Sequence, residues 1–359
     1  MPVLQALTRL TKGFRLQWNL AIQRHCKSRP EGNQVQCHCC SGNCRKSGSY
    51  KNRNRVVQRY FCDRCGKSFR EEQPLDGVRI DHAKAVQVVG MLAETMGIRA
   101  VSRLTGLDKD TVLRILESAG EHCARLLDAK IRNITAMVVQ ADEVYSYVQC
   151  QPHIAIKDDP ERGDFWTFLS VAKYEKLIIN YRVSKRTGED AAEFLKDLRS
   201  RMAMQFQFTT DGFRGYCAHQ NSSGNVQDIL GDVCHYSVEI KKFKDDPKFA
   251  GPRRFYAPQL VKLNRRAKFG CPDMSEATTC HAERTNLTLR TLTRRFVRRT
   301  INFSKKLDNH RHAVALFVAY FNFCRVHKSL NGKTPAMAAR LTDHIWTVEE
   351  LLGANVSTI

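Results

Sequence analysis

The sequence is short of two things, long apolar runs and acidic side chains. A membrane-spanning helix needs a run of about eighteen apolar residues, and no such run occurs in the 359 residues. Asp and Glu number 36 against 58 Lys and Arg, a formal net charge of +22. Charge on this scale repels itself unless a polyanion neutralises it. The composition therefore favours a nucleic-acid partner over a membrane partner.

The beginning of the chain carries no recognisable motif. Basic residues are scattered through residues 1–25, so this stretch lacks the continuous apolar core of a signal peptide. A weakly amphipathic helix and a disordered segment are both compatible with it. We leave residues 1–34 as an unassigned basic leader and expect a cytoplasmic protein.

The cysteines are unevenly spread, with seven of fourteen between residues 26 and 65. This crowding favours a metal site in a reducing compartment over disulfides. Two C-x2-C pairs stand out, Cys37 with Cys40 and Cys62 with Cys65. Four thiolates at this spacing can close a tetrahedral Zn²⁺ site and so fold a segment too polar to form a core. We predict a zinc ribbon at 35–73, with alternative ligands Cys39, Cys44 and His38.

The pattern becomes helical further along the chain. Apolar residues recur at helical spacing from Asp81 onward. A short helix, a turn at Gly106 and a second helix capped by Asp108 then follow. This outline is typical of a helix-turn-helix, whose second helix lies in the major groove. We assign residues 78–133 to this motif and a helical linker, with candidate base contacts Lys109, Asp110, Thr111 and Arg114.

From residue 136 the pattern changes to short strands. Three strands, an amphipathic helix capped by Thr187 and a fourth strand ending at Asp211 are expected. This is the order of an RNase H-like α/β core with a mixed sheet, in which the first and fourth strands are neighbours. Asp142 on the first strand would then meet Asp211. We assign residues 134–350 to this domain and its C-terminal helices.

The stretch after the fourth strand is longer than such a core needs. A fifth strand is expected at 234–243, and the Pro, Gly and Arg content of residues 245–275 indicates an inserted loop. We place a basic insertion at about 238–275, which could hold DNA. Near the end of the chain, an apolar stripe predicts a core helix with Ala313, Leu316, Phe317, Tyr320 and Phe321.

Three acids are candidates for a divalent-metal site, Asp142, Asp211 and Glu283. Two carboxylates a few ångström apart cannot both ionise cheaply unless a cation lies between them. Oxygen ligands favour Mg²⁺ or Mn²⁺, and two such ions can clamp the attacking and leaving oxygens of a phosphodiester exchange. The alternatives are structural: a first-turn helix acid for Glu283, a strand-end cap for Asp142 and an Asp-Gly turn for Asp211.

Glu283 stands alone among basic residues. It is the only acid between Glu276 and Asp308, and eight Lys or Arg lie between 284 and 306. Arg290 follows two helical turns later and projects from the same face. This helix would therefore present a metal ligand and a phosphate ligand together. His281 is a possible auxiliary group, and the further phosphate contacts we expect are Arg294, Arg295 and Arg298.

Several motifs resemble a known family. QADEVYSYV, TTDGFRGY and HAERTNLTLRTLTRRF look like the DDE transposases of the bacterial insertion sequence 1 family. RYFCDRCGKSF and the helix-turn-helix are similar to the DNA-binding part of that family, so the resemblance covers roughly residues 37–350. It implies Asp142, Asp211 and Glu283 as the catalytic triad, with Arg290 as the basic residue that follows.

The resemblance also implies an activity and partners. The chain would bind the terminal repeats of an insertion element, nick the DNA strand with two Mg²⁺ or Mn²⁺ ions and transfer it to target DNA. Joining two ends requires a homodimer or a higher assembly on double-stranded DNA, in the cytoplasm and nucleoid of a bacterium or archaeon. Three alternatives remain open: a DNA-binding regulator, a decayed or domesticated transposase without catalysis, and an RNase H-like nuclease.

Overall fold

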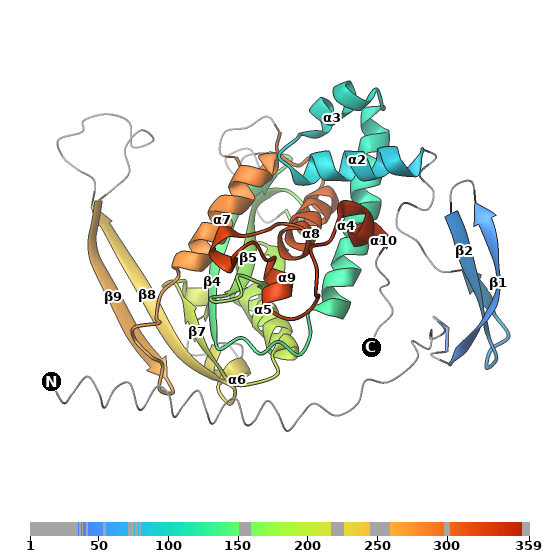
Figure 1. The fold of residues 1–359 in the computed structure, drawn as a ribbon. Coiled ribbons are helices and arrows are strands. Elements are labelled where there is room, and N and C mark those ends of the chain that lie inside the picture. Colours follow the sequence, from blue (N-terminus) through green and yellow to red (C-terminus); the bar gives the residue numbers. More distant parts are fainter. Residues whose placement is uncertain are drawn as a thin grey trace. The chain divides into compact units, whose positions relative to one another are not determined.

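The computed structural model describes residues 35, 37, 39–40, 42–52, 55–70, 75, 78, 80–150, 159–216, 226–244, 259–297 and 302–353. The chain forms two compact units (Figure 1). The first runs to Lys51 and includes Val56–Glu71, and the second takes in almost all of the chain from Glu72 onward. Each unit is described by itself.

The first unit contains a small three-stranded sheet in the order β1-β2-β3. Its strands are β1 Cys44–Asn52, β2 Arg55–Cys62 and β3 Ser68–Arg70. Tyr60 on β2 pairs with Phe69 on β3, and their rings stack at 5.7 Å. Its buried core within the described residues is Cys37, Val57, Tyr60 and Cys62. A core of this size stabilises a sheet weakly, and a metal or another cross-link would add to its stability.

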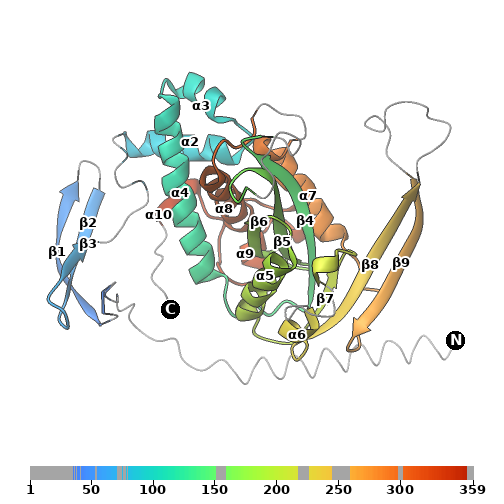
Figure 2. The same cartoon turned by 180° about the vertical axis from the view of Figure 1, so that it is seen from behind.

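The second unit is a mixed α/β fold built on a six-stranded sheet in the order β6-β5-β4-β7-β8-β9 (Figures 1 and 2). Its strands are β4 Val138–Val148, β5 Gly163–Ala172, β6 Ile178–Ser184, β7 Phe206–Thr210, β8 Cys234–Lys244 and β9 Gln259–Phe269. β4, β5 and β6 are antiparallel, whereas β7 pairs in parallel with both β4 and β8. The prediction that the first and fourth strands lie side by side is confirmed, since these strands are β4 and β7.

The helices of the second unit pack on this sheet and on one another. They are α2 His82–Ala93, α3 Ile98–Thr105, α4 Lys109–Lys130, α5 Gly188–Arg201, α6 Val226–Leu230, α7 Cys280–Leu292, α8 Leu307–Phe323, α9 Pro335–Ala338 and α10 Val348–Gly353, with 3-10 turns at Arg214–Tyr216, Arg294–Phe296 and Lys328–Leu330. α7 packs on β4 and β5, and α5 on β6. None of the described helices is long and apolar enough to cross a bilayer.

Local signals in the sequence explain where several helices begin and end. The Asp81 side chain caps α2, and the Asp108 side chain accepts from the Asp110 N–H at 2.8 Å to cap α4. Thr187 caps α5 through the Asp190 N–H at 3.1 Å. Gly106 ends α3 with φ +68°, a left-handed conformation that glycine adopts without strain. The predicted caps and turn are therefore present.

α4 is one continuous helix of 22 residues, which joins the second helix and the helical linker expected from the sequence. Its buried face packs on α8, and the two backbones approach closely at Gly120. A Cβ there would lie only 2.4 Å from the His312 Cβ. α4 therefore belongs to the core of the second unit, while Lys109 and Arg114 near its start are exposed.

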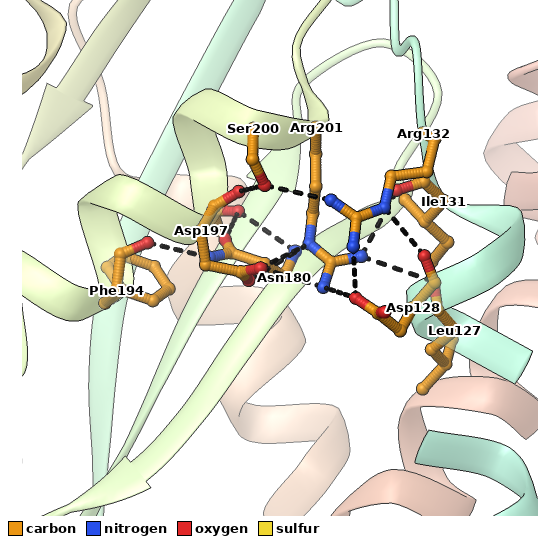
Figure 3. Close-up of polar contacts among 10 residues, drawn as sticks. Leu127, Asp128, Ile131, Arg132, Asn180, Phe194, Asp197, Ser200 and Arg201 are labelled. Carbon is orange, nitrogen blue, oxygen red and sulfur yellow. Dashed lines mark hydrogen bonds and ion pairs between the residues drawn. The ribbon is translucent and has the colours of Figure 1, made fainter. Parts of the chain in front are cut away.

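The end of α4 is tied to α5 by arginines (Figure 3). The buried Arg201 guanidinium donates to the Leu127 and Ile131 carbonyls in the last turn of α4, at 3.3 and 3.2 Å. The Leu127 carbonyl also accepts the Ile131 N–H, so it has two donors. It also contacts Asp128 at 2.9 Å and Asp197 at 3.0 Å. A charge that satisfies four acceptors at once fixes the angle between the two helices.

Residues 259–269 correct one prediction. They were expected to be part of an inserted loop, but they form β9, which pairs antiparallel with β8. The side chains of β9 from Leu260 to Lys268 are largely exposed on both faces. Without a buried face the strand lacks the alternation of apolar and polar residues by which strands are recognised. The expected loop residues 245–258 lie outside the described residues.

The most buried histidine provides a test of the packing of the second unit. The His310 ring contacts the hydroxyls of Ser304 and Ser146 at 2.8 and 3.1 Å. Burial, reinforced by the charge of Arg295, lowers the pKa of His310 to about 3. Because the folded pKa lies below the unfolded value near 6.5, His310 stabilises the fold fully above that pH. This contribution is lost as the pH falls from about 6.5 towards 3.

We predict that wild-type protein loses about 1.4 kcal/mol of unfolding free energy per pH unit below pH ~6 because of His310. A His310→Gln variant should lack this part of the slope, although it starts from lower stability at pH 8. Urea unfolding at several pH values between 4 and 8 measures both. Identical slopes for the two proteins would show that His310 can take a proton without opening the fold.

Candidate metal centres

Four cysteines of the first unit converge. The Sγ atoms of Cys37, Cys40, Cys62 and Cys65 all lie within 4.8 Å of one another. Cys37 faces Cys65 at 3.5 Å, and Cys40 faces Cys62 at the same distance. The two C-x2-C pairs thus supply one compact set of soft sulfur donors, which is the donor chemistry of a structural Zn²⁺ site.

The alternative ligands lie outside this set of four. Cys39 is exposed, and its sulfur contacts the Lys67 ammonium at 3.4 Å. The Cys44 thiol is directed to the Gly42 carbonyl at 3.5 Å. His38 lies outside the described residues. In contrast, the backbone N–H of Cys39 lowers the pKa of Cys37 to about 6 against the effect of burial, which favours the thiolate that a metal requires.

We predict that Cys65→Ser loses about one zinc per chain and unfolds the first unit, because its core is too small to persist without the metal. Cys39→Ser and Cys44→Ser are matched controls that should keep their zinc. Elemental analysis of the three purified variants decides the ligand set. Loss of zinc from a control, or its retention by Cys65→Ser, would contradict the assignment.

A second cluster lies in the sheet of the second unit. β4 and β7 run in parallel with Gln140 opposite Thr209, so the residues that follow along each strand stay side by side. Asp142 on β4 and Asp211 just beyond β7 therefore meet. Their carboxylates and that of Glu143 lie within 4.8 Å of one another. The predicted convergence of Asp142 and Asp211 is present in the structure.

α7 is anchored beside this cluster by a side chain of β4. The buried Gln140 Oε1 accepts from the N–H groups of His281 and Ala282 at 2.8 and 3.3 Å, so it caps the start of the helix. One turn further on, the Asn286 amide donates to Asp142 Oδ2 at 2.9 Å. These contacts place the first two turns of α7, and Glu283 with them, against the first half of β4.

Glu283 shares a pocket with the two aspartates but has other partners. Asp142, Asp211 and Glu283 all line one pocket of about 550 Å³. The Glu283 carboxylate accepts from the Lys241 ammonium and, at 2.8 Å, from the Thr279 hydroxyl. It does not belong to the described group of carboxylates within 4.8 Å. A lysine therefore neutralises the third acid in this structure.

Burial and the repulsion between carboxylates raise the pKa values of the two aspartates in the pocket. Burial raises the pKa of Asp142 to about 6, and the nearby charge of Asp211 adds to the effect. Burial likewise raises the pKa of Asp211, against the Phe213 N–H that donates to it at 2.9 Å. A divalent cation between the two carboxylates would remove this penalty, and oxygen donors suit Mg²⁺ or Mn²⁺. The residues present therefore fit the predicted metal.

Sequence reasoning missed Glu143 and Arg186. Both oxygens of the buried Glu143 carboxylate are occupied: Arg186 donates at 2.9 and 3.2 Å, and the Tyr216 hydroxyl donates at 2.5 Å. Burial raises the pKa of Glu143 to about 8, with the charge of Asp211 adding to it. With three of its roughly four acceptor positions taken, Glu143 has less capacity to bind a metal than Asp142 and mainly orients Arg186. Its only signal in the sequence is its place next to Asp142.

Arg186 is held in an unusual conformation. Its guanidinium lies between the Trp166 and Phe213 rings, 4.3 and 4.2 Å from their centroids. Its backbone has φ +66°, which is strained for a residue other than glycine. One nitrogen lies 3.9 Å from Asp211. The fold thus fixes a positive charge at the wall of the acidic pocket.

The other predicted residues are distributed as follows. Lys109 and Arg114 are exposed on the first turns of α4, and Thr111 is half-buried there. His281 contacts the Lys176 ammonium at 3.1 Å and does not line the acidic pocket. Asp110 is exposed, and its N–H is capped by Asp108.

The arginines that follow Glu283 differ from one another. Arg290 is half-buried in the last turn of α7, and Arg294 is exposed. Arg295 instead donates to the Ser304 hydroxyl at 2.9 Å, and burial lowers its pKa to about 10. Arg298 lies outside the described residues. Arg295 thus supports the His310 contacts, whereas the exposed Arg294 donates to the Thr95 carbonyl at 3.2 Å.

The Lys241–Glu283 pair gives a prediction about metal affinity. Because Lys241 competes with a metal for Glu283, Lys241→Met should tighten Mn²⁺ binding. An ion pair this exposed contributes up to about 1 kcal/mol, or roughly five-fold in affinity. Glu283→Gln should weaken binding. Lys242→Met, one residue along β8, is the charge-matched control. Calorimetric titration without DNA measures all four proteins, and weaker binding by Lys241→Met would contradict the competition.

No protein-family model and no curated protein matches the sequence. Among solved structures, a chain of the simian T-cell lymphotropic virus intasome in complex with the PP2A regulatory subunit B56 gamma is similar with a TM-score of 0.35 and 14% identity, over 71% of this chain and 74% of that one. A chain of the piggyBac transposase synaptic complex with hairpin DNA has a TM-score of 0.35 and 9% identity, over 77% and 71% of the two chains. Similarities this low assign neither a fold family nor a function.

Proposed function

We propose that the chain is a DDE-type transposase with an RNase H-like catalytic core, which nicks the ends of an insertion element and transfers them to target DNA. The observation that carries the proposal is the acidic pocket. Asp142 and Asp211 come from parallel neighbouring strands, and Glu283 enters the same pocket from α7. Acids converging from three separate elements suit metal ligation better than three unrelated structural roles.

The three acids would hold two Mg²⁺ or Mn²⁺ ions. When bound, these ions activate water or a 3′-hydroxyl and stabilise the charge that develops on the phosphate. Asn286 holds the Asp142 carboxylate, and the Phe213 N–H holds that of Asp211. Both ligands are thus oriented before any metal arrives, which removes part of the cost of ordering the site. Glu283 would be the third ligand, in place of its present contact with Lys241.

Basic residues around the pocket would hold the DNA backbone. Arg186, Arg214 and Lys241 line the pocket together with the acids. Arg290 and Arg294 follow on α7 and in the turn after it. A phosphate placed at the metals would thus have guanidinium and ammonium donors on several sides, which suits a polyanionic strand.

Recognition of the element's ends is assigned to the N-terminal parts of the chain. The zinc ribbon at 35–73 and the helix-turn-helix within 78–133 would bind the terminal repeats, with Lys109, Thr111 and Arg114 at base edges. Because two ends must be joined, we propose a homodimer or higher assembly on DNA. The protein would act in the cytoplasm, on the nucleoid.

The test is strand cleavage with acid-to-amide variants. We predict that wild-type protein with Mn²⁺ nicks labelled duplex DNA taken from the flanks of its own coding sequence and joins the 3′-ends to a second duplex. Asp142→Asn, Asp211→Asn and Glu283→Gln should each abolish both steps, because they remove the charge that holds the ions. Binding of DNA in chelator should be kept or slightly strengthened, because a negative charge near phosphate has gone. Asp308→Asn, an exposed acid on α8, is the matched control.

The products separate the alternatives. Joined products support the transposase, whereas nicking without joining identifies a nuclease. Metal-independent binding without any nicking identifies a regulator or a decayed transposase. Near-normal joining by Glu283→Gln would remove the third acid from the mechanism.

A further inference from the structure

β8 and β9 extend past the end of β7 as a two-stranded ribbon (Figure 1). Residues directly opposite each other in an antiparallel pair share a face. Lys241 is opposite Leu263, and Phe243 is opposite Leu260 beyond a register shift. One face of the ribbon, which we call the site face, therefore carries Lys241, Phe243, Leu260 and Leu263. The other face carries the residues between them.

The site face continues the acidic pocket. Nearest the sheet its charges are paired, Arg265 with Glu239 and Lys241 with Glu283. Further out it becomes apolar. Phe243, Leu260 and Leu263 are 56%, 53% and 42% exposed. Phe243 itself lines the pocket that holds Asp142 and Asp211. A large apolar ring is thus presented to solvent beside the candidate metal ligands.

The opposite face of the ribbon is basic. Lys242 lies directly opposite Lys262, and Arg266 follows two pairs further along β9. All three side chains are exposed. Like charges directly opposite each other destabilise a strand pair, and a polyanion lying along this face would remove the repulsion. The charge therefore favours nucleic acid over a second copy of this basic chain as the partner of the ribbon.

Phe243 stands between Lys242 and Lys244. Aromatic rings among basic residues are typical of surfaces that bind unpaired nucleotides, because bases stack on the rings while the cations hold the phosphates. No other ring stacks on Phe243 among the aromatic contacts of the described residues. With 56% of its side chain exposed, the ring is accessible to such a partner.

We propose that the β8–β9 ribbon binds an unpaired end of DNA, with Phe243 stacking on a nucleobase next to the phosphate held at Asp142, Asp211 and Glu283. The basic face, with Lys242, Lys262 and Arg266, lies along the sugar-phosphate backbone. This rests on the proposed function and goes beyond it. It identifies the preferred DNA form as an end whose last bases are unstacked, and it assigns the contact to one side chain.

The test is metal-free binding to a forked duplex with about six unpaired nucleotides, one of which is 2-aminopurine. Stacking on Phe243 should quench its fluorescence when wild-type protein binds. Phe243→Ala should abolish the quenching and weaken binding to the fork by about 5- to 150-fold. Binding to a fully paired duplex of the same length should change little. Phe243→Trp should restore the preference for the fork.

Tyr174→Ala is the matched control, since Tyr174 is an equally exposed ring, 47% accessible, that does not line the pocket. Unchanged quenching and fork preference in Phe243→Ala would overturn the proposal. So would dissociation of a protein dimer by Phe243→Ala, which would identify the apolar face as an interface between copies. Because the readout needs no metal, it is independent of cleavage. If wild-type protein fails to nick DNA in Mn²⁺, the proposed function fails instead.

Discussion

The parallel pairing of β4 with β7 is the constraint on which the site depends. It sets Asp142 beside Asp211 and so forces two carboxylates into a partly buried space, where each raises the cost of ionising the other. The surrounding contacts oppose this cost: Asn286 and the Phe213 N–H donate to the two acids, and Arg186 brings a positive charge to within 3.9 Å of Asp211. The structure thus holds a pair of charges that a divalent cation would satisfy more fully.

Much of the second unit follows from local signals. The caps at Asp108 and Thr187 and the glycine turn at Gly106 act over a few residues, so the sequence alone predicts them. The neighbouring of the first and fourth strands also follows, because the order of elements leaves few unknotted arrangements. β9 could not be predicted in this way. Its side chains face solvent on both sides of the sheet. Its position is set by backbone pairing with the edge of β8.

The residues that support the site were harder to predict from the sequence than its three acids. Glu143 is paired with Arg186 across 43 residues of sequence, and Lys241 reaches Glu283 across 42. No periodicity relates such partners, since their meeting depends on strand register and on where α7 is anchored. An acid can be recognised by its place in or just after an expected strand, as with Asp142 within β4 and Asp211 just beyond β7. The base that neutralises it can be recognised only once the sheet is assembled.

The arrangement of charges around the pocket shows where the few acids of the sequence are used. Near the pocket, Glu239 and Glu283 are each paired with a base from the β8–β9 ribbon. The bases further out, Lys242 and Lys262, have no such neighbour across the strand pair and face each other instead. Within the part of the ribbon that the structure describes, positive charge is thus neutralised at the pocket and left unbalanced further out. Along a DNA strand that follows the ribbon inward, the ribbon's lysines would replace water as partners of the phosphates. The strand would meet Phe243 before it reaches the acids. Glu283 is the one carboxylate among many bases in this part of the sequence, and it holds the ribbon's Lys241 next to the pocket, a place that a metal would take under the proposed function.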